Sequence, residues 1–113
     1  MQRDIGYFSD ILDSTKLAVE YLDKISYNEF KQNTAIQDAV IRRIEIIGEA
    51  VKNLSNEIKN KYPEIPWRKI TGMKDILIHK YFGIDLELTW EVVIRDLDEL
   101  KNNIIRIKEE LSD

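Results

Sequence analysis

The spacing of the apolar residues constrains this 113-residue sequence most strongly. Apolar side chains recur every three to four positions along nearly the whole chain, and four glycines and two prolines punctuate the pattern. A side chain returns to the same face of an α-helix after 3.6 residues, so this spacing predicts amphipathic helices rather than strands. We therefore expect an all-α fold.

The first half of the chain predicts two helices. Apolar residues between Ile5 and Ile25 form two stripes, which indicates a helix that packs on two sides. A second helix is expected to begin at Thr34, because Gln37 three residues later resembles a capping box. Its apolar pattern continues to about Lys61, so this helix is predicted to be long.

Two further helices are predicted in the second half. Pro63 ends the second helix, and Pro66 suits the start of a third helix over about residues 67–82. Gly83 fits the left-handed residue that ends a helix, and Asp85 is a plausible N-cap for a fourth. The apolar pattern of this last helix continues to the end of the chain.

These helices predict one domain over residues 1–113. A chain of this length with 43% hydrophobic residues can bury one core but not two. Short connections between long amphipathic helices favour an up-and-down antiparallel four-helix bundle. The two stripes of the first helix and the seven-position seam of the last offer more apolar surface than a small bundle needs, which predicts a homodimer.

The composition excludes several kinds of chemistry. The sequence has no cysteine and one histidine, which excludes thiolate zinc sites, iron–sulfur clusters, thiol nucleophiles and multi-histidine metal sites within one chain. Neither a membrane span of ~18 apolar residues nor a signal peptide is evident. We therefore expect a cytoplasmic protein with no cofactor, no metal and no membrane partner.

The charge is unevenly distributed. The net charge is −4, but residues 34–83 contain nine basic and six acidic residues and the single histidine. This distribution permits a phosphate-binding face in the middle of the chain.

The predicted third helix contains the one histidine, His79. On a helix, Asp75 and His79 would be in side-chain contact because they are four residues apart. A carboxylate orients an imidazole and stabilises its protonated form, which suits proton transfer near neutral pH. Lys74 would lie about 140° from His79 around the helix, so the two would converge only through the long lysine stem or at a partner surface. A solvated surface pair is the alternative interpretation of Asp75 and His79.

A two-fold dimer would bring two copies of this histidine to one cleft, one as general base and one as general acid. With cations from Lys74 and from Arg68 or Lys80, such a cleft suits cleavage of RNA by its own 2′-hydroxyl without a metal. Arg42 and Arg43 are further candidates for RNA binding, although a solvated helix face explains them equally well.

Two segments resemble a known family. IRRIEIIGEAVKNLS at 41–55 and IPWRKITGMKDILIHKYFGIDLELTWEVV at 65–93 are similar, in order and spacing, to the HepT-like ribonuclease toxins of the HEPN superfamily. The resemblance covers essentially the whole chain. It implies a dimerising helical bundle in which each protomer adds an Arg-x4-6-His motif to a shared, metal-independent RNA-cleaving cleft. His79 then matches the catalytic histidine and Asp75 the residue that orients it, whereas Lys74 replaces the arginine.

The resemblance also implies a partner. Toxins of this family are usually paired with an MNT-type nucleotidyltransferase antitoxin, which in some members adds adenylate to the tyrosine of a His-x-Tyr motif. Tyr81 matches that tyrosine and is the candidate for AMPylation. The helical wheel instead groups Tyr81 with Ile70 and Leu77 on the core side, as an aromatic at the edge of the core.

Two functions remain open. The first is an RNA endonuclease toxin of a type II toxin–antitoxin system, acting as a homodimer through His79, Lys74 and Asp75. The alternative is a catalytically weak or inactive HEPN bundle that serves as binding partner and substrate of a nucleotidyltransferase. The lysine at position 74 keeps this alternative open, because it offers one mobile charge in place of a bidentate fork.

Overall fold

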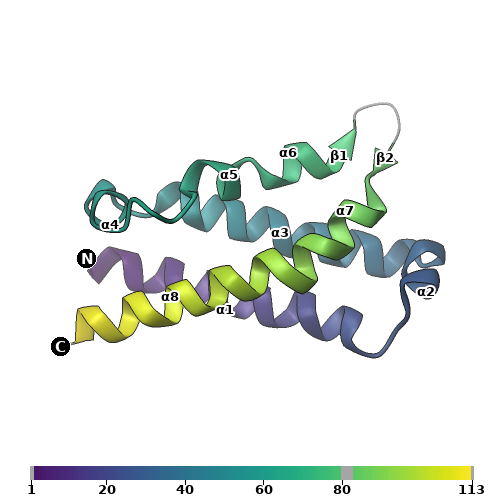
Figure 1. Ribbon diagram of the computed structural model, residues 1–113, viewed down its shortest axis with the longest axis horizontal. Helices are drawn as coiled ribbons and strands as arrows, with labels where there is room; N and C mark the ends of the chain where they lie inside the picture. The colour runs from purple at the N-terminus through teal and green to yellow at the C-terminus, as the bar shows by residue number, and fades with distance from the viewer. Residues whose placement is uncertain (1, 80–82, 113) are drawn as a thin grey trace.

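A computed structural model describes residues 2–79 and 83–112 of the chain. The fold is all-α, as the apolar spacing predicts, and the longest elements are helices (Figure 1). The helical segments are α1 (Gln2–Asp23), α2 (Tyr27–Gln32), α3 (Thr34–Asn53), α4 (Asn56–Lys61), α5 (Trp67–Thr71), α6 (Met73–Leu77), α7 (Leu86–Glu91), the π-helical turn η1 (Val92–Asp96) and α8 (Leu97–Ser112). Two short strands, β1 (Ile78–His79) and β2 (Gly83–Ile84), pair antiparallel.

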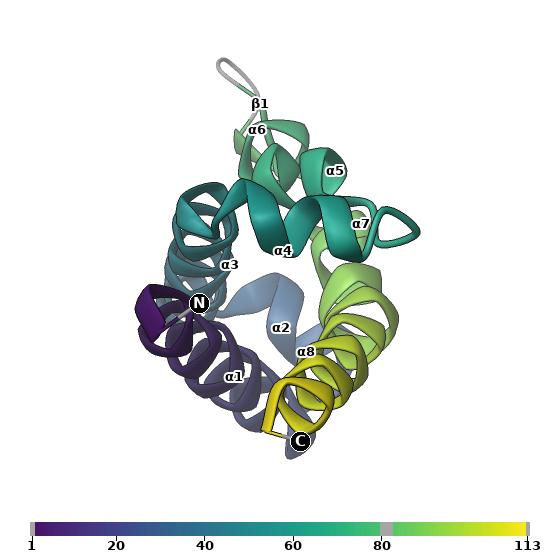
Figure 2. The same ribbon diagram turned by 90° about the vertical axis from the view of Figure 1, so that its left-hand side faces the viewer.

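The long helices lie side by side. Helix α3 runs back along α1, and α5 and α6 then return along α3 (Figure 1). The continuous run of α7, η1 and α8 comes back beside α1, so both termini lie at the same end of the molecule. Seen along the helices, α1, α3 and α8 surround the interior and α4, α5 and α6 close the remaining side (Figure 2).

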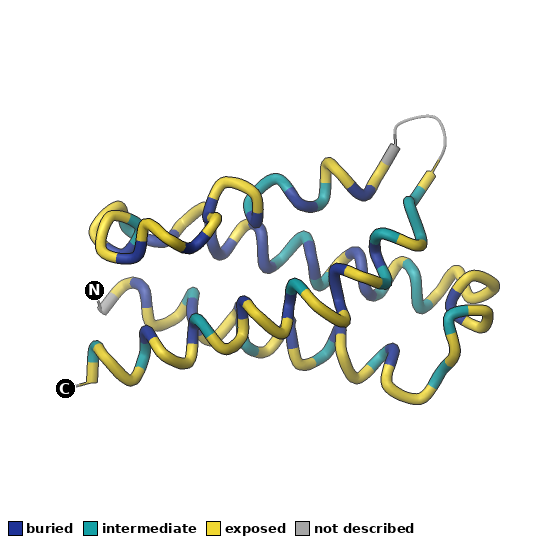
Figure 3. Tube along the Cα trace, in the orientation of Figure 1, coloured by how far each residue is buried: buried dark blue, intermediate teal, exposed yellow. Residues whose placement is uncertain are grey.

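Buried residues recur along each long helix, mainly on the turns next to neighbouring helices, and exposed residues lie between them (Figure 3). The largest fully buried side chains come from every long helix and include Phe8, Phe30, Ile44, Leu77 and Ile104. The carboxylate of Asp4 is also buried, and it accepts hydrogen bonds from the backbone N–H (2.7 Å) and hydroxyl (2.8 Å) of Ser55. This contact joins the first turn of α1 to the start of α4. Among the described residues, no helix combines the length and apolar character needed to cross a membrane.

The predicted second helix begins at Thr34 as expected, but its predicted cap and its predicted end are wrong. Asn33 is the N-cap of α3, since its side chain accepts from the backbone N–H of Ile36, while the Gln37 amide donates to the carbonyl of Phe30. Thr34 and Gln37 therefore form no capping box. At the other end the backbone becomes extended at Leu54, and a new helix, α4, begins after Ser55. The sequence pattern conceals this break because the buried side chains keep helical spacing across it.

The predicted third helix over residues 67–82 begins at Trp67 as expected but is not continuous, and residues 80–82 lie outside the described part of the chain. It is divided at Gly72 into α5 and α6, and the backbone becomes extended at Ile78. The carbonyl of Leu77 accepts a hydrogen bond from the backbone N–H of Asp85 (2.7 Å), which ties the end of α6 to the start of α7. His79 consequently lies in β1, opposite Gly83.

The predictions for the last helix agree better with the structure. Gly83 has the left-handed backbone that we expected (φ +81°), but it lies in β2 rather than at the end of a helix. Asp85 is the N-cap of α7, and its carboxylate accepts from the backbone N–H of Leu88. Helical structure then continues to Ser112, interrupted by the π-helical turn η1.

Candidate active site

Gly48 sets the distance between α3 and the segment before His79. It is buried, and a side-chain Cβ there would lie 3.2 Å from the backbone carbonyl oxygen of Thr71 at the end of α5. Glycine lets the two backbones approach this closely because it has no side chain. Since α6 follows directly after Gly72, this contact also fixes where α6 lies along α3.

The close packing brings Lys74 of α6 to Glu45 of α3. The lysine Nζ lies 3.4 Å from Glu45 Oε2, and Nη1 of Arg42 lies 3.1 Å from Glu45 Oε1. Hydrogen bonds from Arg42 first, and from Lys74 second, lower the pKa of Glu45 below its ordinary value. One carboxylate therefore lies between two cations, and all three side chains are at least one-third exposed.

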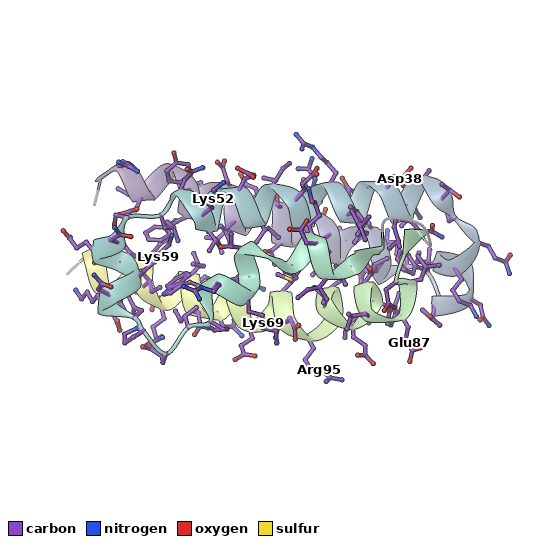
Figure 4. The ribbon with its side chains drawn as sticks, turned by 90° about the horizontal axis from the view of Figure 1, so that it is seen from above. Asp38, Lys52, Lys59, Lys69, Glu87 and Arg95 are labelled. Atoms are coloured by element: carbon purple, nitrogen blue, oxygen red, sulfur yellow. The ribbon has the colours of Figure 1, made fainter. Side chains whose placement is uncertain are left out.

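These residues border a polar groove of about 210 Å³ between α3 and the α5–α6 segment. Its described lining includes Lys74 and Asp75, so two of the predicted site residues face one groove, together with Glu45, Glu49 and Lys52. Seen from above, α6 lies between α3 and α7, and Lys52 projects from α3 (Figure 4). The acidic side chains of this groove outnumber its lysines, so the groove by itself does not select a phosphate.

The predicted relation between Asp75 and His79 depended on a single helix, and this part of the prediction is wrong. Asp75 is in α6, but the helix ends at Leu77 and the backbone of His79 forms part of the β1–β2 ladder. The helical angle between Lys74 and His79 no longer applies for the same reason. The hydrogen bond from Asp85 to Leu77, which sequence spacing does not reveal, is the physical cause.

The other candidate residues are spread over several elements. Arg42 is exposed and reaches Lys74 through Glu45, Arg43 is half-buried on α3, and Arg68 is exposed on α5. Lys80 and Tyr81 lie outside the described residues. In the described part of the chain, no three His, Asp or Glu side chains are placed to hold a metal ion.

The sequence analysis missed Glu45 and Gly48. An arginine and a glutamate three residues apart on a helix are expected to pair, so Arg42 pointed to Glu45. A glycine inside a helical pattern indicates close packing, which applies to Gly48. The contact of Glu45 with Lys74, 29 residues away, is a product of the fold alone.

Comparison with known proteins identifies the family of this helical chain. A family model described as "Ribonuclease HepT-like" matches residues 11–107, and the chain belongs to this HepT-like family. The match includes α3, Lys74, Asp75 and His79.

Similar proteins bear ribonuclease names. The chain is 52% identical over 112 residues to a Methanocaldococcus jannaschii protein named "Gamma-glutamylcyclotransferase and putative RNase", an alignment that covers 98% of this chain and 50% of that protein. It is 43% identical over 104 residues to a "Putative RNase" of the same organism (91% and 95% covered). It is 41% identical over 102 residues to the "Probable ribonuclease HepT" of Thermococcus cleftensis (90% and 93% covered). The chain thus spans half the length of the first relative and nearly all of the other two. No solved structure matches it.

Proposed function

We propose that this protein is a metal-independent RNA endonuclease, the toxin of a type II toxin–antitoxin pair, which cuts RNA in a cleft shared by two protomers. The observation that supports this function best is the HepT-like ribonuclease match over residues 11–107, which includes the chain's single histidine. In this proposal the helices of each protomer form an up-and-down bundle, and two bundles meet near β1.

The proposed reaction uses one His79 from each protomer. One imidazole accepts the proton of the RNA 2′-hydroxyl, and the resulting oxygen attacks the adjacent phosphorus. The bond from phosphorus to the 5′-oxygen breaks, and that oxygen takes a proton from the second imidazole. The products are a 2′,3′-cyclic phosphate end and a 5′-hydroxyl end. In this proposal Asp75, which lines the groove with Lys74, orients an imidazole through a contact that does not depend on helical spacing. Lys74 stabilises the additional negative charge on the phosphoryl oxygens.

Lys74 can stabilise charge on the RNA phosphate only when it is released from Glu45. The lysine amine already donates to Glu45, so an RNA phosphate has to compete with that carboxylate for it. Both side chains of the pair are about 40% exposed, which leaves the amine accessible to a competing anion. Arg42, released at the same time, would join Arg43, Arg68 and Lys80 as phosphate contacts along the RNA backbone.

The paired lysine also favours a second function. A lysine provides one point charge where an arginine would provide a bidentate fork, and here that charge is shared with Glu45. Loss of one such transition-state contact typically costs about 10²-fold in rate. A protein weakened in this way would act mainly as binding partner and substrate of an MNT-type nucleotidyltransferase, with Tyr81 as the residue that receives adenylate.

Cleavage of mixed RNA in EDTA distinguishes the two functions. We expect the purified wild-type protein to leave 2′,3′-cyclic phosphate ends, and His79→Ala to leave RNA intact while keeping the helical circular dichroism of the wild type. Cleavage by Lys74→Arg but not by wild type would support the second function. Cleavage by His79→Ala at the wild-type rate would overturn the proposed mechanism.

A further inference from the structure

A long apolar groove follows the seam between α1 and α8. Of the six large apolar side chains that are exposed among the described residues, three line this seam: Val19 (40% exposed), Ile94 (56%) and Ile105 (37%). Three adjoining hollows of about 490, 450 and 350 Å³ follow one another along it. The first two share Leu12 and Ile105, and the last two share Val19 and Asp98, so they form one continuous groove.

The charges beside this groove are divided about its middle. Helices α1 and α8 run antiparallel, which places Lys16 and Lys101 on one side of the midpoint and Glu20 and Asp98 on the other. All four side chains line the central hollow and are exposed. Asp13, also exposed there, lies on the side of the two lysines, so that side has a net charge of +1 and the other a net charge of −2. A face with a cationic half and an anionic half is complementary to a second copy of itself turned by 180°.

The sequence of η1 and α8 has the same symmetry. Ile94, Asp98, Lys101 and Ile105 share one face of the helical run and are separated by four, three and four residues. When two copies of this helical run pack antiparallel, Ile94 of each copy meets the other isoleucine, Ile105, of the second copy. The aspartate of each copy likewise meets the lysine of the second copy. On α1, Lys16 and Glu20 are related in the same way about Ala18. The midpoints of these two patterns lie side by side along the helix direction. At one end of the central hollow Leu12 of α1 lies with Ile105 of α8, and at the other end Val19 lies with Asp98.

We propose that the α1–α8 groove binds a second copy of this chain, antiparallel, about a two-fold axis through its midpoint. Ile94 then packs on Ile105 of the partner subunit, and Asp98 pairs with Lys101 of the partner subunit. The contact removes the exposed Val19, Ile94 and Ile105 from water, which accounts for apolar surface that the single domain leaves uncovered.

This contact is separate from the proposed RNA cleft. In both views β1, which contains His79, lies on the side of the molecule opposite to α1 and α8 (Figures 1 and 2). The groove contact therefore stands on its own observations and does not rest on the proposed ribonuclease function. A protomer with two such symmetric faces forms assemblies larger than a dimer.

Charge reversal tests the pairing, with assembly mass measured by sedimentation velocity and light scattering. Asp98→Lys and Lys101→Asp each place like charges opposite one another, and we expect each to reduce the wild-type mass at least two-fold. The double variant Asp98→Lys/Lys101→Asp restores opposite charges and should restore the mass. Asp38→Lys, an exposed change on α3, is the matched control and should leave the mass unchanged.

Several outcomes would overturn the proposal. A wild-type mass equal to that of the single variants would exclude the contact, as would a double variant that stays as small as they are. The His79→Ala protein keeps this groove intact and should respond to the same charge reversals. Its response separates the groove contact from any failure of the RNA cleft.

Discussion

Replacing Glu45 by glutamine removes one negative charge from the candidate site and preserves the size of the side chain. The carboxylate lies 3.4 Å from the amine of Lys74 and 3.1 Å from the guanidinium of Arg42. Its removal leaves both cations free to meet a phosphate. We therefore expect the Glu45→Gln variant to bind RNA more tightly than the wild type.

The size of this effect follows from the geometry of the pair. Two unit charges 3.4 Å apart attract by about 1 kcal/mol in bulk water and about 5 kcal/mol at an effective dielectric constant of 20. The side chains of Lys74 and Glu45 are 40% and 36% exposed, so solvent screens most of this attraction. Exposed pairs of this kind contribute roughly 0.2–1 kcal/mol. Taking about 0.5–1 kcal/mol as the cost of separating them predicts a two- to five-fold lower Kd for RNA.

Fluorescence anisotropy of a short labelled RNA measures this Kd, in a His79→Ala background to prevent cleavage. The dependence of Kd on salt should also become steeper, since more cations meet phosphates. Glu49→Gln is the matched control, because Glu49 lines the same groove and has no ion pair in the described part of the chain. If Glu45→Gln binds no more tightly than wild type, or Glu49→Gln gives the same gain, the assigned competition between Glu45 and RNA is wrong.

Three further predictions concern stability. Asp4→Ala should lower the free energy of unfolding in urea by about 2–4 kcal/mol, because Ser55 loses a buried charged acceptor for two hydrogen bonds, whereas the exposed Asp10→Ala should change it by less than about 0.5 kcal/mol. Gly83→Ala should cost about 1–2 kcal/mol in the same assay, since a residue with a Cβ is strained at φ +81°; an unchanged midpoint would refute this backbone argument. The lowered pKa of Glu45 stabilises the fold above the unfolded-state value of about 4.3, and this contribution is lost as the pH falls through the lower folded-state value. The unfolding free energies of wild type and Glu45→Gln should therefore converge as the pH falls below the unfolded-state pKa, and a constant difference would contradict the ion-pair assignment.

The sequence predicts the helical class because burial requires apolar side chains on one face, and that requirement is visible as helical spacing. It does not predict where helices break. Val51, Leu54 and Ile58 are all buried and keep the spacing, although α3 ends at Asn53 and α4 begins at Asn56. Spacing reports which face is buried, whereas helix ends depend on hydrogen bonds such as the one from Ser55 to Asp4, 51 residues away.

In the candidate site, too, some features can be predicted from the sequence and others depend on long-range contacts. Lys74 and Asp75 face one groove because adjacent residues at the start of α6 are held against α3 by Gly48. The helical relation of Asp75 to His79 is wrong because the carbonyl of Leu77 is bonded to Asp85. The sequence therefore predicts Lys74 and Asp75, which are neighbours in the chain, as site residues. It does not predict the contact of Lys74 with Glu45, because that contact depends on how α6 packs against α3.

The proposal that each cleft uses His79 from both protomers is tested most directly by mixing. Wild-type and His79→Ala chains are refolded together from urea in varying proportions at constant total protein, and the RNA cleavage rate is measured in EDTA. If both imidazoles are required, the rate follows the square of the wild-type fraction, so an equal mixture retains about one quarter of the wild-type rate. A linear decline, with about one half retained, or no cleavage by the wild-type protein itself, would contradict the shared cleft.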